Sequence, residues 1–189
     1  MIGGKPFLIL DPWRGRAEEA GLRERILQQL RSLEFEALEL CVCRLLSECG
    51  YQKVQMLGRR QFVGRNRAGG ADIGARIATP TGLEKVLIQV KQYSVPVSKR
   101  AVDELRGVLL REDCQQGVLV STSAFSPLAL SAARRVPLLP VRCIGGSELA
   151  DLCVRYRIGV VESSLPVLTL DEQFFDKLTE EATLGSAHN

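Results

Sequence analysis

The segment ADIGARIATPTGLEKVLIQVKQY, residues 71–93, is typical of two antiparallel strands joined by a tight turn. Two alternating runs flank the sequence TPTG, whose proline and glycine favour a turn centred on residues 80–81. With the turn there, Asp72 at the start of the first strand lies roughly opposite Gln89 or Lys91 on the second, within the diagonal reach of cross-strand neighbours. The segment therefore predicts a hairpin with polar residues at its open end.

Side chains of a strand alternate between its two faces. Gln89 and Lys91 consequently share one face, and the opposite face is apolar with Val86, Ile88 and Val90. Two structural readings of this pattern stay open from the strand alone. It fits an antiparallel strand with one solvated face, or an edge strand on which a lysine blocks aggregation.

Outside the hairpin, helical and strand-like patterns alternate, which predicts parallel crossovers with helices on both faces of a sheet. We expect an α/β protein with a three-layer α/β/α sandwich and a mixed sheet that begins with the antiparallel hairpin. Helices are expected at 16–33, 35–49, 98–112, 126–135 and 147–157, and further strands at 53–57, 61–63, 117–122, 138–144 and 159–162.

Small polar residues and glycine are placed to begin and end these helices. Helix starts are expected at Ser32, Ser98, Ser126 and Ser147, and Gly50 is expected to end the second helix.

The composition indicates a globular chain with a basic body and an acidic end. Residues 171–189 hold five acidic residues and one lysine, so residues 1–170 carry 24 basic and 17 acidic groups. Four arginines without an acidic neighbour lie between Gly58 and Gly70, directly before Asp72. They are expected to contact phosphate, and a solvated loop is the alternative. They are Arg59, Arg60, Arg65 and Arg67.

Several classes of site and location are excluded by what the chain contains. The one histidine, His188, lies in a Gly/Ser/Ala-rich tail, which argues against histidine triads and histidine metal clusters. The six cysteines form no CxxC pair and are interpreted as buried thiols. The first apolar run, residues 7–10, is too short for a signal peptide or a membrane span, so we expect a cytoplasmic protein.

Asp72, Gln89 and Lys91 together form a set that suits phosphodiester hydrolysis. A carboxylate and an amide oxygen can bind a hard divalent cation, and an ammonium group can meet the scissile phosphate and its attacking water. A single carboxylate leaves such a cation poorly neutralised, so a second is expected from the preceding helix. The candidates there are Glu34, Glu36 and Glu39.

These motifs resemble the catalytic domain of the Mrr-type restriction endonucleases, in the branch of the PD-(D/E)xK nucleases with a D…QxK motif. The matching segments are GGADIGARI, LEKVLIQVKQY, GVLVSTSAFSPLALSAA, LLPVRCIGGSELADLCVRYRIGV and the helix ending LLSECGY. The resemblance covers residues 35–175 and implies a restriction-endonuclease-like fold, DNA as the substrate and Mg²⁺ or Mn²⁺ as the cofactor. It divides the chain into an N-terminal extension with a charged helix (1–32), an Mrr-like nuclease domain (33–170) and an acidic tail (171–189).

The function expected from the resemblance is a metal-dependent DNA endonuclease of the restriction or defence type, with modification dependence and a homodimer as open options. A junction-resolving nuclease and a DNA-binding pseudoenzyme that positions a partner are the alternatives. Catalysis is assigned to Asp72, Gln89, Lys91 and Glu39, and the metal to Asp72 and Glu39. Glu36, one helical turn earlier, is the alternative to Glu39, which the family's spacing to LLSECGY selects. Glu36 lies opposite the apolar stripe of the helix, whereas Glu39 lies on the flank of that stripe.

Overall fold

The computed structural model describes residues 16–57, 70–80 and 82–161, with side chains from residue 21 onward. Five strands form one mixed sheet in chain order. The first two pairings, β1 with β2 and β2 with β3, are antiparallel, and β3 with β4 and β4 with β5 are parallel. The strands are β1 (Gln52–Met56), β2 (Ile73–Thr79), β3 (Gly82–Lys91), β4 (Gln116–Ser121) and β5 (Val141–Ile144).

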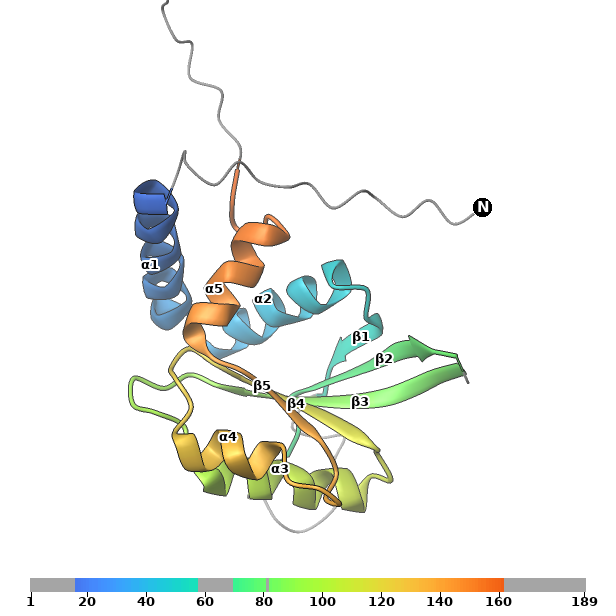
Figure 1. The fold of residues 1–189 in the computed structure, drawn as a ribbon. Helices are drawn as coiled ribbons and strands as arrows, with labels where there is room; N and C mark the ends of the chain where they lie inside the picture. Colours follow the sequence, from blue (N-terminus) through green and yellow to red (C-terminus); the bar gives the residue numbers. More distant parts are fainter. Residues whose placement is uncertain (1–15, 58–69, 81, 162–189) are drawn as a thin grey trace, which may run out of the picture.

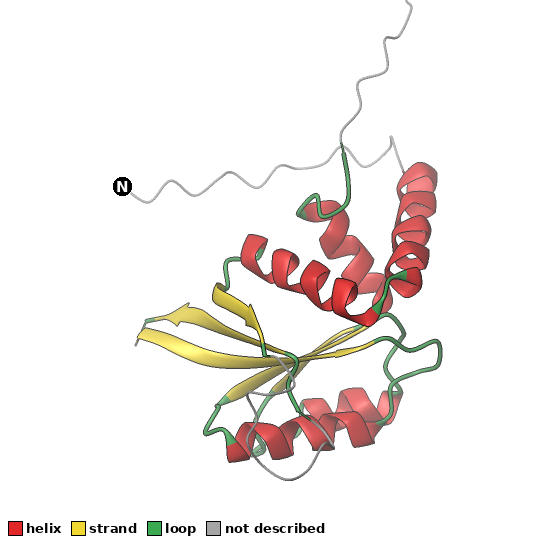
Figure 2. Ribbon diagram, turned by 180° about the vertical axis from the view of Figure 1, so that it is seen from behind, coloured by secondary structure: helices red, strands yellow, loops and turns green. Residues whose placement is uncertain are grey.

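Helices cover both faces of this sheet. Figures 1 and 2 show α1, α2 and α5 on one side and α3 and α4 on the other. The predicted three-layer sandwich is therefore confirmed. The helices are α1 (Arg16–Ser32), α2 (Phe35–Glu48), α3 (Lys99–Arg111), α4 (Pro127–Ala133) and α5 (Gly146–Arg155).

The β2–β3 hairpin has the expected register. Thr79 pairs with Gly82, so the pairing of the two strands begins where expected, and it runs without a shift to Ile73 opposite Ile88. The next position along each strand places Asp72 beside Gln89, at the open end of the hairpin.

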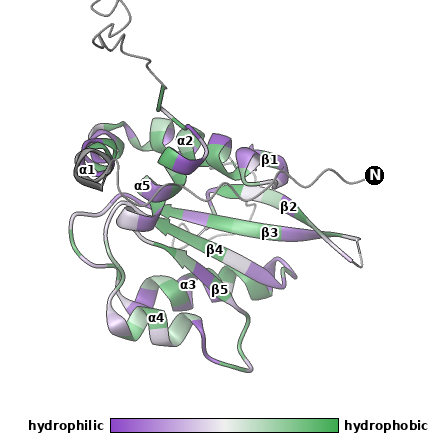
Figure 3. Cartoon of the chain, turned by 45° about the horizontal axis from the view of Figure 1, so that its top comes forward, coloured by the Kyte–Doolittle hydropathy of each residue, from purple (hydrophilic) through white to green (hydrophobic). Residues whose placement is uncertain are grey.

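Each face of the sheet has its own apolar core, because the central strands are covered on both sides. Val86, Ile88 and Val90 pack into the core beneath α2 and α5, whereas Leu87 and Leu119 belong to the core against α3 and α4. The hydropathy colouring shows hydrophobic stretches in both central strands, β3 and β4, beside hydrophilic segments (Figure 3). The burial of residues 86–90 on both faces, and the position of β3 between β2 and β4, exclude the reading of this segment as a half-solvated or edge strand.

Helix ends follow local rules at some positions and tertiary contacts at others. Gly50 has φ 93° and closes α2, with its N–H donating to Ser47 O and that of Tyr51 to Leu46 O, as in a Schellman motif. The Ser126 side chain accepts the Ala129 N–H at the start of α4, as predicted.

Three local predictions were wrong. Ser32 does not begin α2, whose N-cap is Glu34. The Ser32 hydroxyl donates instead to Gln29 O at 2.9 Å, within α1. Gly145, rather than Ser147, is the N-cap of α5. Residues 159–161, the described part of the expected last strand, form no strand.

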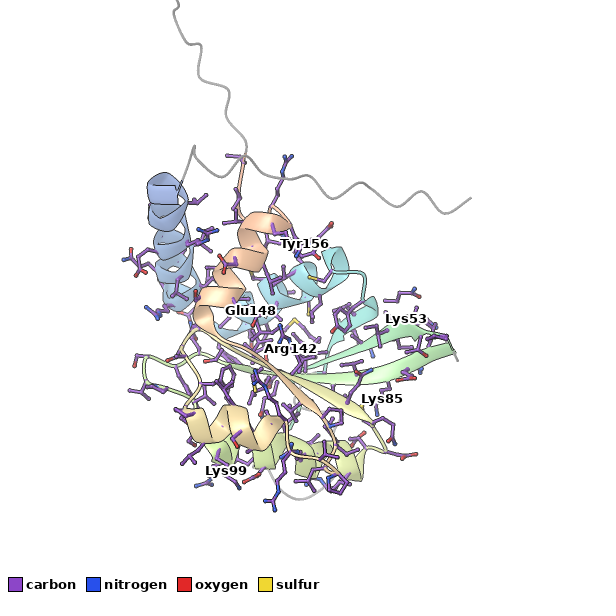
Figure 4. All side chains as sticks on the ribbon, viewed as in Figure 1. Lys53, Lys85, Lys99, Arg142, Glu148 and Tyr156 are labelled. Atoms are coloured by element: carbon purple, nitrogen blue, oxygen red, sulfur yellow. The ribbon has the colours of Figure 1, made fainter. Side chains whose placement is uncertain are left out.

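Ion pairs between described residues connect the layers at their surface. Figure 4 labels Arg142 on β5 and Glu148 on α5, which form an exposed pair, and Lys85 on β3, which lies 3.3 Å from Glu112 after α3. Exposed pairs contribute about 0–1 kcal/mol each, so the two apolar cores hold the helices on the sheet.

Candidate active site

Asp72 lies where β2 begins, and its side chain extends the pairing of the strands. Its backbone N–H donates to Ile88 O at 2.8 Å, and its carbonyl accepts the Leu57 N–H at 2.8 Å. Its carboxylate Oδ2 accepts the Val90 N–H at 2.7 Å, so a side chain satisfies an amide that β2 no longer reaches. This bond fixes the carboxylate against the backbone of β3 through one of its two oxygens.

The Asp72 carboxyl is held in a partly desolvated position. Burial raises its pKa above the usual value, and the Val90 N–H and the Lys91 ammonium oppose this rise. The effect of burial is the larger one, so the site disfavours the ionised form of this carboxyl.

Gln89 is 3% exposed and has only one end of its amide satisfied. Its Nε2 donates to Gly70 O at 2.9 Å, and that donor could not be exchanged for Oε1 without placing two acceptors against each other. Oε1 is buried and has no hydrogen-bond partner among the described residues. A buried acceptor without a partner costs about 1–3 kcal/mol and calls for an explanation.

Lys91 follows Gln89 on the same face of β3 and is only partly exposed. Its ammonium acts on the Asp72 carboxyl and lies 6.0 Å from the centre of the Tyr93 ring. The structure therefore brings Asp72, Gln89 and Lys91 together at the open end of the hairpin.

The two helix glutamates differ in exposure. Glu39 is 9% exposed and belongs to the buried side of α2. Burial and, to a lesser extent, the charge of Glu39 raise the pKa of Cys43, one turn along the helix, to about 11. Glu36 is exposed in the first turn. This difference favours Glu39, as the helix pattern does. However, α2 covers the face of Val86, Ile88 and Val90, opposite to that of Gln89, and the role of Glu39 stays a prediction.

The predicted phosphate-binding arginines, Arg59, Arg60, Arg65 and Arg67, lie outside the described residues. All six cysteines are free; Cys114 and Cys153 are buried and the other four are partly buried.

The donors at the hairpin end suit a hard divalent cation. Nowhere in residues 16–57, 70–80 and 82–161 do three His, Cys, Asp or Glu side chains gather as a metal-binding group. The oxygen donors present are a carboxylate and an amide, the types that Mg²⁺ accepts beside water and substrate phosphate. Gln89 Oε1, buried with no partner in the described part of the chain, is the observation that fits such an ion.

Sequence reasoning did not identify the buried polar residues behind the site. Ser121, Thr122 and Ser123 are 0%, 0% and 5% exposed, directly at the end of β4. The available signal was three consecutive hydroxyl side chains after a fully apolar strand, because buried hydroxyls need specific partners. No pattern in the sequence indicated the hydrogen-bond partners of Gln92.

Within the described segments, no helix is both long enough and apolar enough to cross a lipid bilayer.

Comparisons with known proteins agree with this geometry. A family model described as a restriction endonuclease, that of the Mrr catalytic domain, matches residues 30–153. The type IV methyl-directed restriction enzyme EcoKMrr of Escherichia coli K12 is 28% identical over 156 residues, which are 81% of this chain and 49% of that enzyme. The chain thus spans about half the length of this curated relative.

Two solved structures share the fold. The restriction endonuclease MspJI, in complex with a 27-mer oligonucleotide, is 24% identical with a TM-score of 0.54, covering 76% of this chain and 33% of that one. The DNA modification-dependent restriction endonuclease AspBHI is 21% identical with a TM-score of 0.54, covering 77% and 37%.

Proposed function

The chain belongs to the Mrr-type restriction endonuclease family, and from this membership we propose that it is a divalent-metal-dependent DNA endonuclease of the defence type. Its substrate is the phosphodiester backbone of DNA, and Mg²⁺ or Mn²⁺ is its cofactor. Asp72, Gln89 and Lys91 are its catalytic residues.

One observation carries the proposal. Gln89 Oε1 is buried without a partner among the described residues, next to a carboxylate whose ionisation burial disfavours. A cation would satisfy the first atom and would also favour the ionised form of the second. Both costs therefore disappear on binding a metal ion.

In this proposal Asp72 and Gln89 hold the ion, and Glu39 supplies the second carboxylate. The bound ion would neutralise charge on the scissile phosphate and lower the pKa of a water molecule. Lys91 binds a non-bridging phosphate oxygen and orients the attacking water, because its ammonium shares a face with Gln89. The Gly70 carbonyl keeps the Gln89 amide in the orientation that presents Oε1.

Affinity for DNA comes from charges away from these residues. The arginines at 59, 60, 65 and 67 precede Asp72 by a few residues, and residues 1–170 carry an excess of seven positive charges. Contacts of this kind bind the phosphate backbone in any sequence, so they position the DNA without specifying the site.

The test is cleavage by the purified full chain of linear, methylated, unmethylated and four-way-junction DNA, with Mg²⁺, Mn²⁺ or EDTA. The E. coli relative is named methyl-directed, so methylated DNA is the first substrate. Metal-dependent cleavage that is lost in Lys91→Ala, with DNA binding retained, supports the proposal. Cleavage restricted to junctions would indicate a resolvase, and binding without cleavage under any condition would indicate a pseudoenzyme.

A further inference from the structure

The chain segment that leaves β3 after Lys91 is held from two sides by groups distant in sequence. Gln92 points to the side opposite Lys91, and its Nε2 donates to Leu33 O at 2.7 Å and to Arg31 O at 3.1 Å, with Leu30 O at 3.4 Å. These carbonyls lie at the end of α1, where helix carbonyls lack partners within the helix. Gln92 thus satisfies the end of α1 and ties it to the catalytic strand.

Thr122, fully buried after β4, holds the same segment through its backbone and its hydroxyl. Its N–H donates to Lys91 O at 3.1 Å. Its Oγ1 accepts the Tyr93 N–H at 3.1 Å and donates to Tyr93 O at 3.1 Å. One threonine therefore fixes the backbone on both sides of Gln92.

The Thr122 carbonyl returns the connection to α1. It accepts two hydrogen bonds from the Arg31 guanidinium, from Nε at 3.2 Å and Nη2 at 3.1 Å. Gly146 lies tightly against this carbonyl: a Cβ on Gly146 would come within 2.6 Å of it. The carbonyl therefore has little freedom, and the bonds to Arg31 and Gln92 close a ring between α1, β3 and β4.

These hydrogen bonds hold the backbone of Lys91 and of Tyr93, whose aromatic ring lies near the Lys91 ammonium. Lys91 and Tyr93 are two residues apart and so share a face, and the ammonium lies 6.0 Å from the ring centre, at the limit of a cation–π contact. Release of Tyr93 from Thr122 would free both the ring and the ammonium.

We propose that Thr122, Gln92 and Arg31 are positioning residues for Lys91, and that the end of α1 is thereby part of the support of the active site. The proposal rests on the proposed function, since it assigns Lys91 a substrate phosphate. Thr122 acts through the backbone of Lys91 and Tyr93, and Gln92 and Arg31 act by fixing the segment against α1.

Two readouts test it: steady-state cleavage of plasmid DNA with Mg²⁺, and the NMR shift of the Lys91 ε-methylene protons in lysine-labelled protein. The Tyr93 ring shifts those protons upfield, and Tyr93→Leu gives the reference without a ring. Thr122→Val and Gln92→Leu are expected to lose the upfield shift. They are also expected to lose about 10- to 100-fold in kcat with KM unchanged, as a misplaced catalytic group does.

Two matched variants separate positioning from general stability. Thr122→Ser keeps the hydroxyl and should restore both readouts. Asp151→Asn removes the ion pair between Arg23 of α1 and Asp151 of α5. This weakens the attachment of α1 at a place remote from β3 and should change neither kcat nor the lysine shift.

Wild-type kcat and lysine shift in both Thr122→Val and Gln92→Leu would overturn the proposal, as would an equal loss in Asp151→Asn. If Thr122→Val does not fold, the comparison of kcat and lysine shift between Gln92→Leu and Asp151→Asn decides the proposal. Absence of cleavage by the wild-type protein would refute the proposed function alone, because the lysine shifts still decide whether these residues position Lys91.

Discussion

Replacement of Gln89 by glutamate tests the metal site through stability as well as activity. The substitution changes one NH₂ group to an oxygen at nearly constant volume. It removes the 2.9 Å hydrogen bond to Gly70 O and sets two oxygens against each other at a position that is 3% exposed. The new carboxyl can restore the bond only by keeping its proton.

The cost of keeping that proton limits the destabilisation. An unperturbed glutamate has a pKa of about 4.3, so protonation at pH 7 costs up to about 3.7 kcal/mol, at 1.36 kcal/mol per unit. For a chain of this size that corresponds to a decrease in Tm of roughly 7–15 °C. The folded state raises the pKa of this carboxyl. The folded variant therefore has its full stability below about pH 4.3 and loses stability as pH rises, by up to about 1.4 kcal/mol per pH unit.

The assay is thermal or urea denaturation of wild type and Gln89→Glu between pH 4 and pH 8, in EDTA and in Mg²⁺. The matched control is Gln55→Glu, the same change at an exposed position of β1. In EDTA the Gln89 variant should lose stability with rising pH relative to this control, and Mg²⁺ should restore it, because the ion favours the ionised carboxylate. A pH-independent difference, or no rescue by Mg²⁺ and Mn²⁺, would refute the assignment of Oε1 to the metal.

Three further predictions follow from the site. Burial raises the Asp72 pKa, so stability falls as pH rises through it. Asp72→Asn should therefore match or exceed wild-type stability in EDTA at pH 7 but lose cleavage and the stabilisation by Mg²⁺, about 2.7 kcal/mol at a hundredfold excess over Kd; a large loss of stability in EDTA would contradict this. Glu39→Gln should abolish cleavage and weaken Mg²⁺ binding by titration calorimetry, whereas Glu36→Gln should leave both unchanged; the reverse pattern would assign the ligand to Glu36. Alanine at all four loop arginines should weaken DNA binding equally across sequences and flatten its dependence on salt by roughly one counterion per lost contact, and an unchanged slope would exclude phosphate contact. These arginines are Arg59, Arg60, Arg65 and Arg67.

The sequence by itself determined the layers and the chemistry of the hairpin end. Strand alternation and turn residues are local properties, so they fixed the register that places Asp72 beside Gln89, with Lys91 on the same face as the amide. The alternation of helices and strands likewise predicted the parallel part of the sheet. Burial of Glu39 and exposure of Glu36 agree with the helix pattern for the same reason.

Only the tertiary structure decided which partners these residues have. Gln89 owes its orientation to Gly70 O, 19 positions away, and the Lys91–Tyr93 segment depends on Thr122 and on the end of α1. Helix starts failed in the same way: serines near α2 and α5 offered caps, but the packed chain began those helices at Glu34 and Gly145. The sequence shows which hydrogen-bond donors and acceptors a side chain carries. Its partner is determined only when distant segments pack together, because each buried polar group must then form a hydrogen bond.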